Sequence, residues 1–347
     1  REDGRGVARA PIGREQGYVS PRAENMARGG KGIGVGDDPG VGCADMANPE
    51  LLKRIEAAKR AVLAQTELLH REFGKAESRW KSDGTRVTAV DVAISENIFR
   101  ELGAQFSGDQ FFSEELAETD APIPVTATYS WVLDPIDGTN NFALGIPYCA
   151  ISLALCESGE PVYGVVYDLS RRVLMHGGPG FGMHDGEREV KVLNVAPHKE
   201  SIVGFHRPFE PGLLPAANAV LGQFKIRGLG SATLHLAYVA AGLFDGCVDF
   251  NVKIWDLAAA IPLVRAAGGE VTFLNGEQLP MTTFNLKMGR IVYIAGGPIV
   301  AARLKEAWGS MVGSRQSDPS KPGQGMLLDQ GMKYEPLKML TLQDTDA

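Results

Sequence analysis

Two aspartates three residues apart are the strongest candidates for chemistry in this chain. Asp134 and Asp137 lie in the run WVLDPIDGTNNF at residues 131–142. Its first three residues are apolar and β-prone, which predicts a short buried strand that ends in a proline-glycine turn. A helix beginning at Thr139 would direct its free N–H groups at whatever the two carboxylates hold. Two acids beside such a helix suit divalent cations that bridge them to a phosphate.

Taken alone, this pattern is more often a turn than a metal site, because Asp-Pro and Asp-Gly are common turn formers and aspartate caps helices. Other acids also end apolar elements. Asp91 lies in the first turn of a helix that Thr88 caps, Glu114-Glu115 follow a predicted strand, and Asp256 opens an apolar helix. Singly, each acid is better explained as a helix-dipole partner or a solvated group. Jointly they favour a ligand site, because such sites collect where hydrophobic elements end.

The composition is that of an ordinary globular protein: 347 residues, 44% hydrophobic and 22% charged, with a net charge of −7. The negative charge does not indicate a nucleic-acid surface, and no apolar run reaches the length of a membrane helix. Four cysteines without a CxxC pair predict reduced thiols in a cytoplasmic protein. The histidines show no paired ligand spacing, so the sequence favours oxygen-bound Mg²⁺ or Mn²⁺ over Zn²⁺.

Helices and antiparallel strands interleave along the chain. Asn48 caps a helix that we expect to continue to Gly74, and apolar runs at 149–156 and 161–167 predict a hairpin. Asp256 is expected to open one helix that continues to Ala267. The pattern predicts an α/β fold with layers of mixed, largely antiparallel sheets and interleaved helices.

We expect four segments. Residues 1–46 are rich in Gly and Arg and have no apolar signal region, so they are predicted to be disordered, as a leader, a cloning remnant or the product of a misassigned start. Residues 47–200 would form an N-terminal α+β half with the metal site. Residues 201–312 would form a C-terminal α/β half with substrate-side residues, and residues 313–347 a loose tail.

Three motifs in order resemble those of the inositol monophosphatase family of metal-dependent, lithium-sensitive phosphomonoesterases. They are FSEE at 112–115, the run at 131–142, which matches W-x-x-D-P-[IL]-D-G-T-x-N-F, and WDLAA at 255–259, with AGG at 267–269 after it. The resemblance covers roughly residues 48–310. It implies a layered αβαβα sandwich like that of inositol monophosphatases and fructose-bisphosphatases, and a homodimer.

The resemblance implies a ligand set for two or three Mg²⁺ ions, which Mn²⁺ could replace. Glu114, Asp134 and the backbone carbonyl of Ile136 would hold the first ion. Asp134, Asp137 and Asp256 would hold the second ion. Glu114 would also hold a weaker third ion through water, which makes it a catalytic residue as well as a ligand.

The resemblance also implies catalytic and substrate-binding residues. Asp91 and Thr139 would form a hydrogen-bonded pair that orients and deprotonates the attacking water. The N–H groups of Gly138 and Thr139 would bind the phosphate. Gly230-Ser231-Ala232 matches a G-S-A element and would line the substrate pocket, together with Asp137. Asp249 occupies a position where the family often has a Glu that grips a substrate hydroxyl; it is one methylene shorter.

The sequence therefore predicts a Mg²⁺-dependent phosphoric monoester hydrolase that acts on a small phosphorylated metabolite, and not on nucleic acid or a membrane. Myo-inositol 1-phosphate is the leading substrate. Histidinol phosphate, fructose 1,6-bisphosphate and 3′-phosphoadenosine 5′-phosphate are alternatives. A non-catalytic binding scaffold with the same fold is the rival from another class, although a scaffold need not keep every metal ligand.

Overall fold

The computed structural model describes residues 48–81, 84–116, 121–205, 218 and 222–315, all of which belong to one compact unit, Ala44–Ala347. Its helices are α2 (Pro49–Leu63), α3 (Thr66–Glu72), α4 (Ala89–Gln105), α5 (Thr139–Leu144), α7 (Ala232–Ala240), α8 (Ile254–Leu257), α9 (Ala260–Ala266) and α10 (Pro298–Arg315). Within these ranges, none of the helices combines the length and apolar character that a membrane span requires.

A seven-stranded sheet has the order β10-β9-β8-β7-β6-β5-β3. Its strands are β3 (Gln110–Ser113), β5 (Tyr129–Asp137), β6 (Ala150–Glu157), β7 (Glu160–Asp168), β8 (Val173–Gly178), β9 (Gly182–Asp185) and β10 (Arg188–Val190). Neighbouring strands are antiparallel, except that β3 and β5 are parallel. The predicted hairpin is therefore confirmed as β6 and β7.

A five-stranded sheet has the order β12-β11-β13-β16-β14. Its strands are β11 (Ile202–Phe205), β12 (Lys225–Arg227), β13 (Gly246–Val252), β14 (Glu270–Phe273) and β16 (Ile291–Gly296). β11 is parallel to both of its neighbours, and β16 is antiparallel to β13 and β14. Two small pairs complete the described strands: β1 (Ser78–Trp80) with β2 (Arg86–Thr88), and β4 (Ile123–Pro124) with β15 (Thr283–Phe284).

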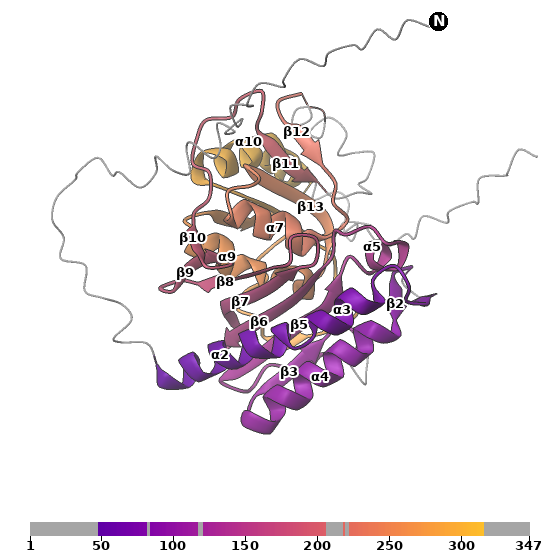
Figure 1. The fold of residues 1–347 in the computed structure, drawn as a ribbon. Coiled ribbons are helices and arrows are strands. Elements are labelled where there is room, and N and C mark those ends of the chain that lie inside the picture. Colours follow the sequence, from indigo (N-terminus) through magenta and orange to yellow (C-terminus); the bar gives the residue numbers. More distant parts are fainter. Residues whose placement is uncertain (1–47, 82–83, 117–120, 206–217, 219–221, 316–347) are drawn as a thin grey trace, which may run out of the picture. The chain divides into compact units, whose positions relative to one another are not determined.

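These elements form five alternating layers (Figure 1). Helices α2 and α4 cover one face of the seven-stranded sheet, α7 and α9 pack between the two sheets, and α10 packs on the other side of the five-stranded sheet. Apolar side chains fill the space on both faces of each sheet. The predicted layered αβαβα fold of mixed, largely antiparallel sheets is confirmed.

The prediction of one helix from Asn48 to Gly74 was wrong, because the chain leaves regular helix at Ala64 and Gln65. Asn48 does cap α2, its Oδ1 accepting from the N–H of Glu50 at 3.0 Å. After the break, the Thr66 hydroxyl donates to the carbonyl of Leu63 at 2.8 Å. This hydroxyl satisfies a carbonyl at the end of α2, and α3 then starts as a separate helix.

Helix α4 begins at the predicted capping box. Thr88 Oγ1 accepts from the backbone N–H groups of Val90 and Asp91 at 3.1 and 3.4 Å, and the Asp91 carboxylate accepts from the Thr88 N–H at 2.8 Å. Three backbone N–H groups at the helix start are satisfied in this way. The bonds from Thr88 also fix the orientation of the Asp91 side chain.

Two local predictions near the candidate site were also wrong. β5 continues through the expected turn as far as Asp137, because β6 still pairs with it there. The pairing register is irregular between Asp134 and Asp137. The helix expected from Asp256 to Ala267 is two helices, α8 and α9, and Asp256 is the third residue of α8. Pro262 then lies in the first turn of α9, where its missing N–H leaves no helical bond unmade.

Some predictions concern residues outside the described ranges, namely the leader at 1–46 and the tail beyond Arg315. Every strand of the seven-stranded sheet precedes residue 191, and every strand of the five-stranded sheet follows residue 201. The division into two halves with separate roles stays a prediction.

Candidate metal centre

Three carboxylates, two from a strand and one from a helix, meet in the structure. Asp134 and Asp137 are buried at the end of β5, whereas Asp256 comes from α8, just after β13. One oxygen of each lies within 4.8 Å of the other two, and this is the only such group of His, Cys, Asp or Glu in the part of the chain that the structure describes. All the donors are carboxylate oxygens, so the residues fit a hard divalent cation such as Mg²⁺ or Mn²⁺.

Burial and mutual repulsion both oppose negative charge on these acids. Burial raises the pKa of Asp134 well above its usual range, and Glu114, Asp137 and Asp256 raise it further. Burial, followed by the charge of Asp137, has the same effect on the pKa of Asp256. A cation between these groups would relieve both effects, so the cluster has a built-in affinity for positive charge.

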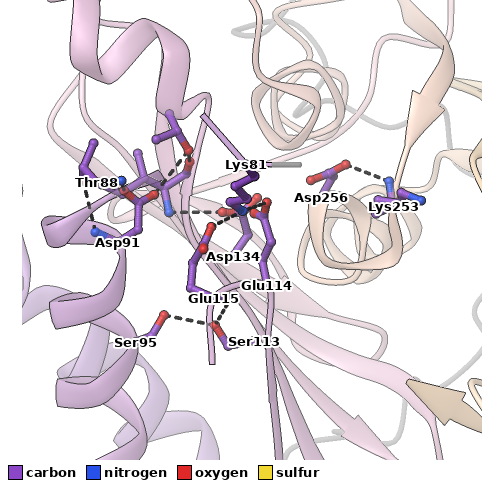
Figure 2. Close-up of polar contacts among 12 residues, drawn as sticks. Lys81, Thr88, Asp91, Ser95, Ser113, Glu114, Glu115, Asp134, Lys253 and Asp256 are labelled. Carbon is purple, nitrogen blue, oxygen red and sulfur yellow. Dashed lines mark hydrogen bonds and ion pairs between the residues drawn. The ribbon is translucent and has the colours of Figure 1, made fainter. Parts of the chain in front are cut away.

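Glu114 and Glu115 lie at the end of β3, next to β5. Figure 2 shows them with Asp134 between Asp91 on one side and Asp256 on the other. Burial raises the pKa of Glu114, and burial followed by the Glu114 charge raises the pKa of Glu115 to about 7. Glu114 is close enough to raise the pKa of both Asp134 and Asp256, but it is not one of the three clustered acids, and its role as a metal ligand stays a prediction.

Lys81 is a site residue that sequence reasoning missed. Its Nζ lies 2.6 Å from Glu114 Oε1 and 2.5 Å from Glu115 Oε1 (Figure 2). Although burial opposes it, the two glutamates raise the pKa of Lys81, so its ammonium stays charged. Lys81 follows β1 in a polar connection without periodicity or spacing, and no signal in the sequence links it to the acids.

The structure brings Asp91 and Thr139 together. Asp91 Oδ2 accepts from the N–H and hydroxyl of Thr88 at 2.8 and 2.5 Å, and Oδ1 lies 3.2 Å from Thr139 Oγ1. Thr139 Oγ1 is also 2.9 Å from the Ile136 carbonyl oxygen, a second acceptor for its single proton. Burial raises the pKa of Asp91, and hydrogen bonds from Thr88 and Thr139 oppose that rise.

Gly138 connects β5 to α5, which begins at Thr139 as predicted. Its φ of +90° lies in the left-handed region, and an added Cβ would come within 2.8 Å of the Tyr148 carbonyl oxygen. Both facts require glycine at this position. The backbone therefore turns sharply into α5 directly beside Asp137.

The G-S-A element lies against the acids through its serine. Ser231 Oγ donates to Asp137 Oδ2 at 2.6 Å, and the same oxygen accepts from the Thr233 N–H at 2.6 Å. Ala232 begins α7, which Ser231 caps, and Gly230 precedes the cap with φ +76°. Thr233 was not predicted, because its partners are distant in sequence.

Asp249 is fully buried on β13, and its charge raises the pKa of Asp256. Its Oδ1 accepts from the N–H groups of Phe250 and Asn251 at 2.8 and 3.1 Å. These bonds lie where the pairing of β13 with β16 becomes irregular, between Asp249 and Val252. One oxygen of Asp249 thus contacts its own strand, and its role toward a substrate stays a prediction.

The fold and the site define a five-layered α/β protein with a carboxylate cluster between its sheets. The profile of the inositol monophosphatase family matches residues 48–316, so the chain belongs to that family, as the motifs predicted.

Relatives in this family carry different names. Over 243 residues the chain is 33% identical to the inositol-1-monophosphatase of Mesorhizobium japonicum, an alignment of 67% of this chain and 89% of that protein. It is 32% identical to the Nus factor SuhB of Pasteurella multocida, over 69% of this chain and 90% of that one. The crystal structure of the extragenic suppressor protein suhB from Bartonella henselae matches with a TM-score of 0.64 and 30% identity, over 73% and 96% of the two chains.

Proposed function

We propose that this chain is a Mg²⁺-dependent phosphomonoesterase that hydrolyses a small phosphate monoester by attack of water. The observation that carries the proposal is the cluster of Asp134, Asp137 and Asp256 beside the Asp91–Thr139 hydrogen bond. Membership of a phosphatase family supports it. Bound Mg²⁺ would neutralise the phosphate dianion, acidify a water and stabilise the leaving alkoxide.

The proposed ligands are those expected from the sequence. Asp134, Asp137 and Asp256 would hold one ion, and Glu114, Asp134 and the Ile136 carbonyl a second. Glu114 contacts the Lys81 ammonium at 2.6 Å, so a cation at Glu114 competes with Lys81 for the same oxygen. A weaker third ion at Glu114 would meet the same competition.

Asp91 and Thr139 would orient the attacking water and take up its proton. The Thr139 hydroxyl has one proton and two acceptors, Asp91 Oδ1 and the Ile136 carbonyl. If the Ile136 carbonyl turns to a cation, the hydroxyl proton is left to Asp91. The oxygen of Thr139 can then accept a hydrogen bond from water while Asp91, fixed by Thr88, serves as the proton acceptor.

The proposed substrate is myo-inositol 1-phosphate, with histidinol phosphate, fructose 1,6-bisphosphate and 3′-phosphoadenosine 5′-phosphate as alternatives. The N–H groups of Gly138 and Thr139 would bind the phosphate at the start of α5. Gly230 to Ala232 and Asp249 would line the part of the pocket that contacts the rest of the substrate.

We also propose that the protein forms a homodimer and acts in the cytoplasm. An exposed apolar run supports self-association: Leu144, Ile146 and Tyr148 are 58%, 41% and 38% exposed, and exposed apolar patches often mark interfaces. The three cysteines that the structure describes, Cys149, Cys156 and Cys247, are buried free thiols, which is compatible with a reducing compartment.

The second candidate is a non-catalytic factor, which the relatives named Nus factor SuhB bring into consideration. A binding scaffold has no need for buried acids whose mutual repulsion lowers stability. The retention of the whole acid set therefore favours the phosphatase.

A phosphate-release screen tests the proposal. The four monoesters would be assayed with Mg²⁺, with excess EDTA and with added Li⁺. We expect release that depends on Mg²⁺, disappears in EDTA and is inhibited by Li⁺, with the highest kcat/KM for myo-inositol 1-phosphate. Full turnover in EDTA would refute the metal dependence, and no release from any monoester would favour the non-catalytic factor.

A further inference from the structure

Asp137 and Asp256 come from different parts of the fold, yet a shared cation requires their oxygens to lie at a fixed spacing. Asp137 ends β5 in the seven-stranded sheet, and Asp256 lies in α8, next to the five-stranded sheet. One oxygen of each acid lies within 4.8 Å of an oxygen of the other, and two carboxylates this close repel each other when both are charged. Other groups must therefore hold the two acids in place.

The segment Ser231–Thr233 contacts both acids. The Ser231 hydroxyl and the Thr233 N–H each donate to Asp137 Oδ2 at 2.6 Å, and the Thr233 hydroxyl donates to the backbone carbonyl of Asp256 at 2.8 Å. Ser231 and Thr233 are both fully buried. Thr233 thus contacts a residue from each side of the site. Its N–H bond to the Asp137 carboxylate is of the strong, charge-assisted kind, whereas its hydroxyl bonds to a neutral backbone carbonyl.

The segment is itself fixed in place. Ser231 Oγ accepts from the N–H of Leu234 at 3.2 Å as the cap of α7. Asn141, in α5, donates to the carbonyls of Leu229 and Tyr148 at 2.7 and 2.8 Å. An added Cβ at Gly230 would come within 2.8 Å of Asn141 Nδ2, so the backbone here packs directly on that side chain. The segment cannot shift without moving α5 or α7.

We propose that Ser231 and Thr233 are positioning residues that fix Asp137 and Asp256 at the spacing a cation needs, and so set the affinity of the site these acids share. The proposal goes beyond the expected role of the G-S-A element as a pocket lining. The Ser231 hydroxyl gives its one proton to Asp137, so it is not available as a donor to a substrate at the same time. A carboxylate fixed through Oδ2 presents its other oxygen in a defined direction, which lowers the reorganisation on binding.

The inference rests on the proposed function only for the choice of cation. It is tested by titrating the purified full chain with Mg²⁺ in the absence of substrate. Thr233→Val removes the hydroxyl that bonds to the Asp256 carbonyl but keeps the side-chain shape and the backbone N–H. Ser231→Ala removes the hydroxyl that donates to Asp137. Calorimetry should show one Mg²⁺ site weakened by about 10- to 100-fold in each variant, the range known for groups that orient metal ligands. The rise in melting temperature on adding Mg²⁺ should shrink accordingly.

Two further variants separate positioning from packing. Thr233→Ser keeps a hydroxyl and should restore most of the affinity that Thr233→Val loses. Ser170→Ala is the matched control, because Ser170 Oγ also donates to a carboxylate, Asp168 Oδ1 at 2.8 Å, and Asp168 is not one of the three clustered aspartates. It should leave the Mg²⁺ affinity unchanged.

Unchanged Mg²⁺ dissociation constants in Thr233→Val and Ser231→Ala, with a lower melting temperature in EDTA, would overturn the inference, because the residues would then act on packing alone. If Ser231→Ala does not fold, Thr233→Val decides the question. Phosphate release by the unmodified chain is measured in parallel. Its absence would refute the proposed function, whereas a weakened Mg²⁺ site in the variants would still support the positioning role.

Discussion

Two regions of buried charge in this molecule differ in how that charge is compensated. In α2, Arg54 donates to Asp109 through Nε and Nη2, at 2.9 and 2.8 Å, and the indole of Trp131 adds a third bond at 2.9 Å. The guanidinium also lies over the rings of Phe106 and Tyr129, 4.5 and 4.1 Å from their centroids. This carboxylate has its counter-charge and its hydrogen bonds within the chain.

The candidate metal centre is the opposite case. Asp134, Asp137 and Asp256 face one another, and Lys81 contacts Glu114 and Glu115 at the edge of the cluster. Charge that is matched within the chain contributes to the fold, whereas like charge gathered between two sheets raises pKa values and attracts an external cation. The comparison therefore predicts that mutations in the two regions affect different quantities.

The largest effect is expected for Asp134→Asn. Asp134 is the proposed ligand of both main cations, so its loss should reduce kcat by about 10³-fold or more, the several kcal/mol that metal ions contribute to such reactions. The fold should be retained, and the melting temperature in EDTA should equal or exceed that of the unmodified chain, because one source of repulsion is gone. Steady-state kinetics and a thermal melt measure both quantities. A kcat like that of the unmodified chain would rule out the assigned role.

Asp109→Asn should show the reverse pattern. It removes the buried counter-charge of the Arg54 guanidinium and leaves only the exposed carboxylate of Glu50, at 3.3 Å, which costs about 3 kcal/mol of unfolding free energy. Urea unfolding would measure this loss, while kcat and the Mg²⁺ dissociation constants of the folded protein stay unchanged. The double variant Arg54→Met/Asp109→Leu is the control, since replacing both charges with apolar groups should recover much of the loss. A change in Mg²⁺ affinity in Asp109→Asn would break the distinction between the two regions.

Sequence signals were strong where they were local and continuous. The run at 131–142 predicted Asp134, Asp137 and a helix at Thr139, because an apolar strand, a glycine and a helix start follow one another directly. The capping box predicted the start of α4 for the same reason. The sequence failed where backbone geometry depends on distant partners: β5 extends to Asp137 because β6 continues to pair with it.

The contacts that complete the site could not be predicted. Lys81 reaches Glu114 across 33 residues, and Ser231 reaches Asp137 across 94. A lysine in a polar turn and a serine before a helix have ordinary local explanations, and periodicity carries no information about such pairs. The five-layer arrangement decides which of these residues meet.

Thr139→Ala should lower kcat by about 10²-fold with a smaller change in KM, because it removes the hydroxyl that we propose orients the attacking water. Thr139→Ser is the matched control and should retain most of the activity. Thr139→Ala should cost little stability, since Asp91 keeps both of its hydrogen bonds from Thr88. If instead Thr139→Ala raised KM at constant kcat, Thr139 would act in substrate binding and not on the water.

The smallest effect concerns the pH dependence of stability without metal. Burial and the neighbouring Glu114 raise the pKa of Glu115 from an ordinary 4.5 to about 7 in the folded chain. Because the pKa of Glu115 is higher in the folded chain than in the unfolded chain, protonation of Glu115 stabilises the fold. This stabilisation is complete below pH 4.5 and is lost as the pH rises through 7. In EDTA, the unfolding free energy should therefore fall by about 1 kcal/mol between pH 6.5 and 8.5.

Glu115→Gln tests whether this slope arises at the acid site, because glutamine does not titrate and should flatten the curve in that pH window. Asp109→Asn should keep the slope of the unmodified chain, although its whole curve lies lower. Saturating Mg²⁺ should weaken or reverse the slope in the unmodified chain, since protons and the cation compete for the same cluster of carboxylates. An unmodified chain whose stability in EDTA increases from pH 6.5 to 8.5 would show that the gathered acids do not oppose folding, and the contrast between the two regions would be lost.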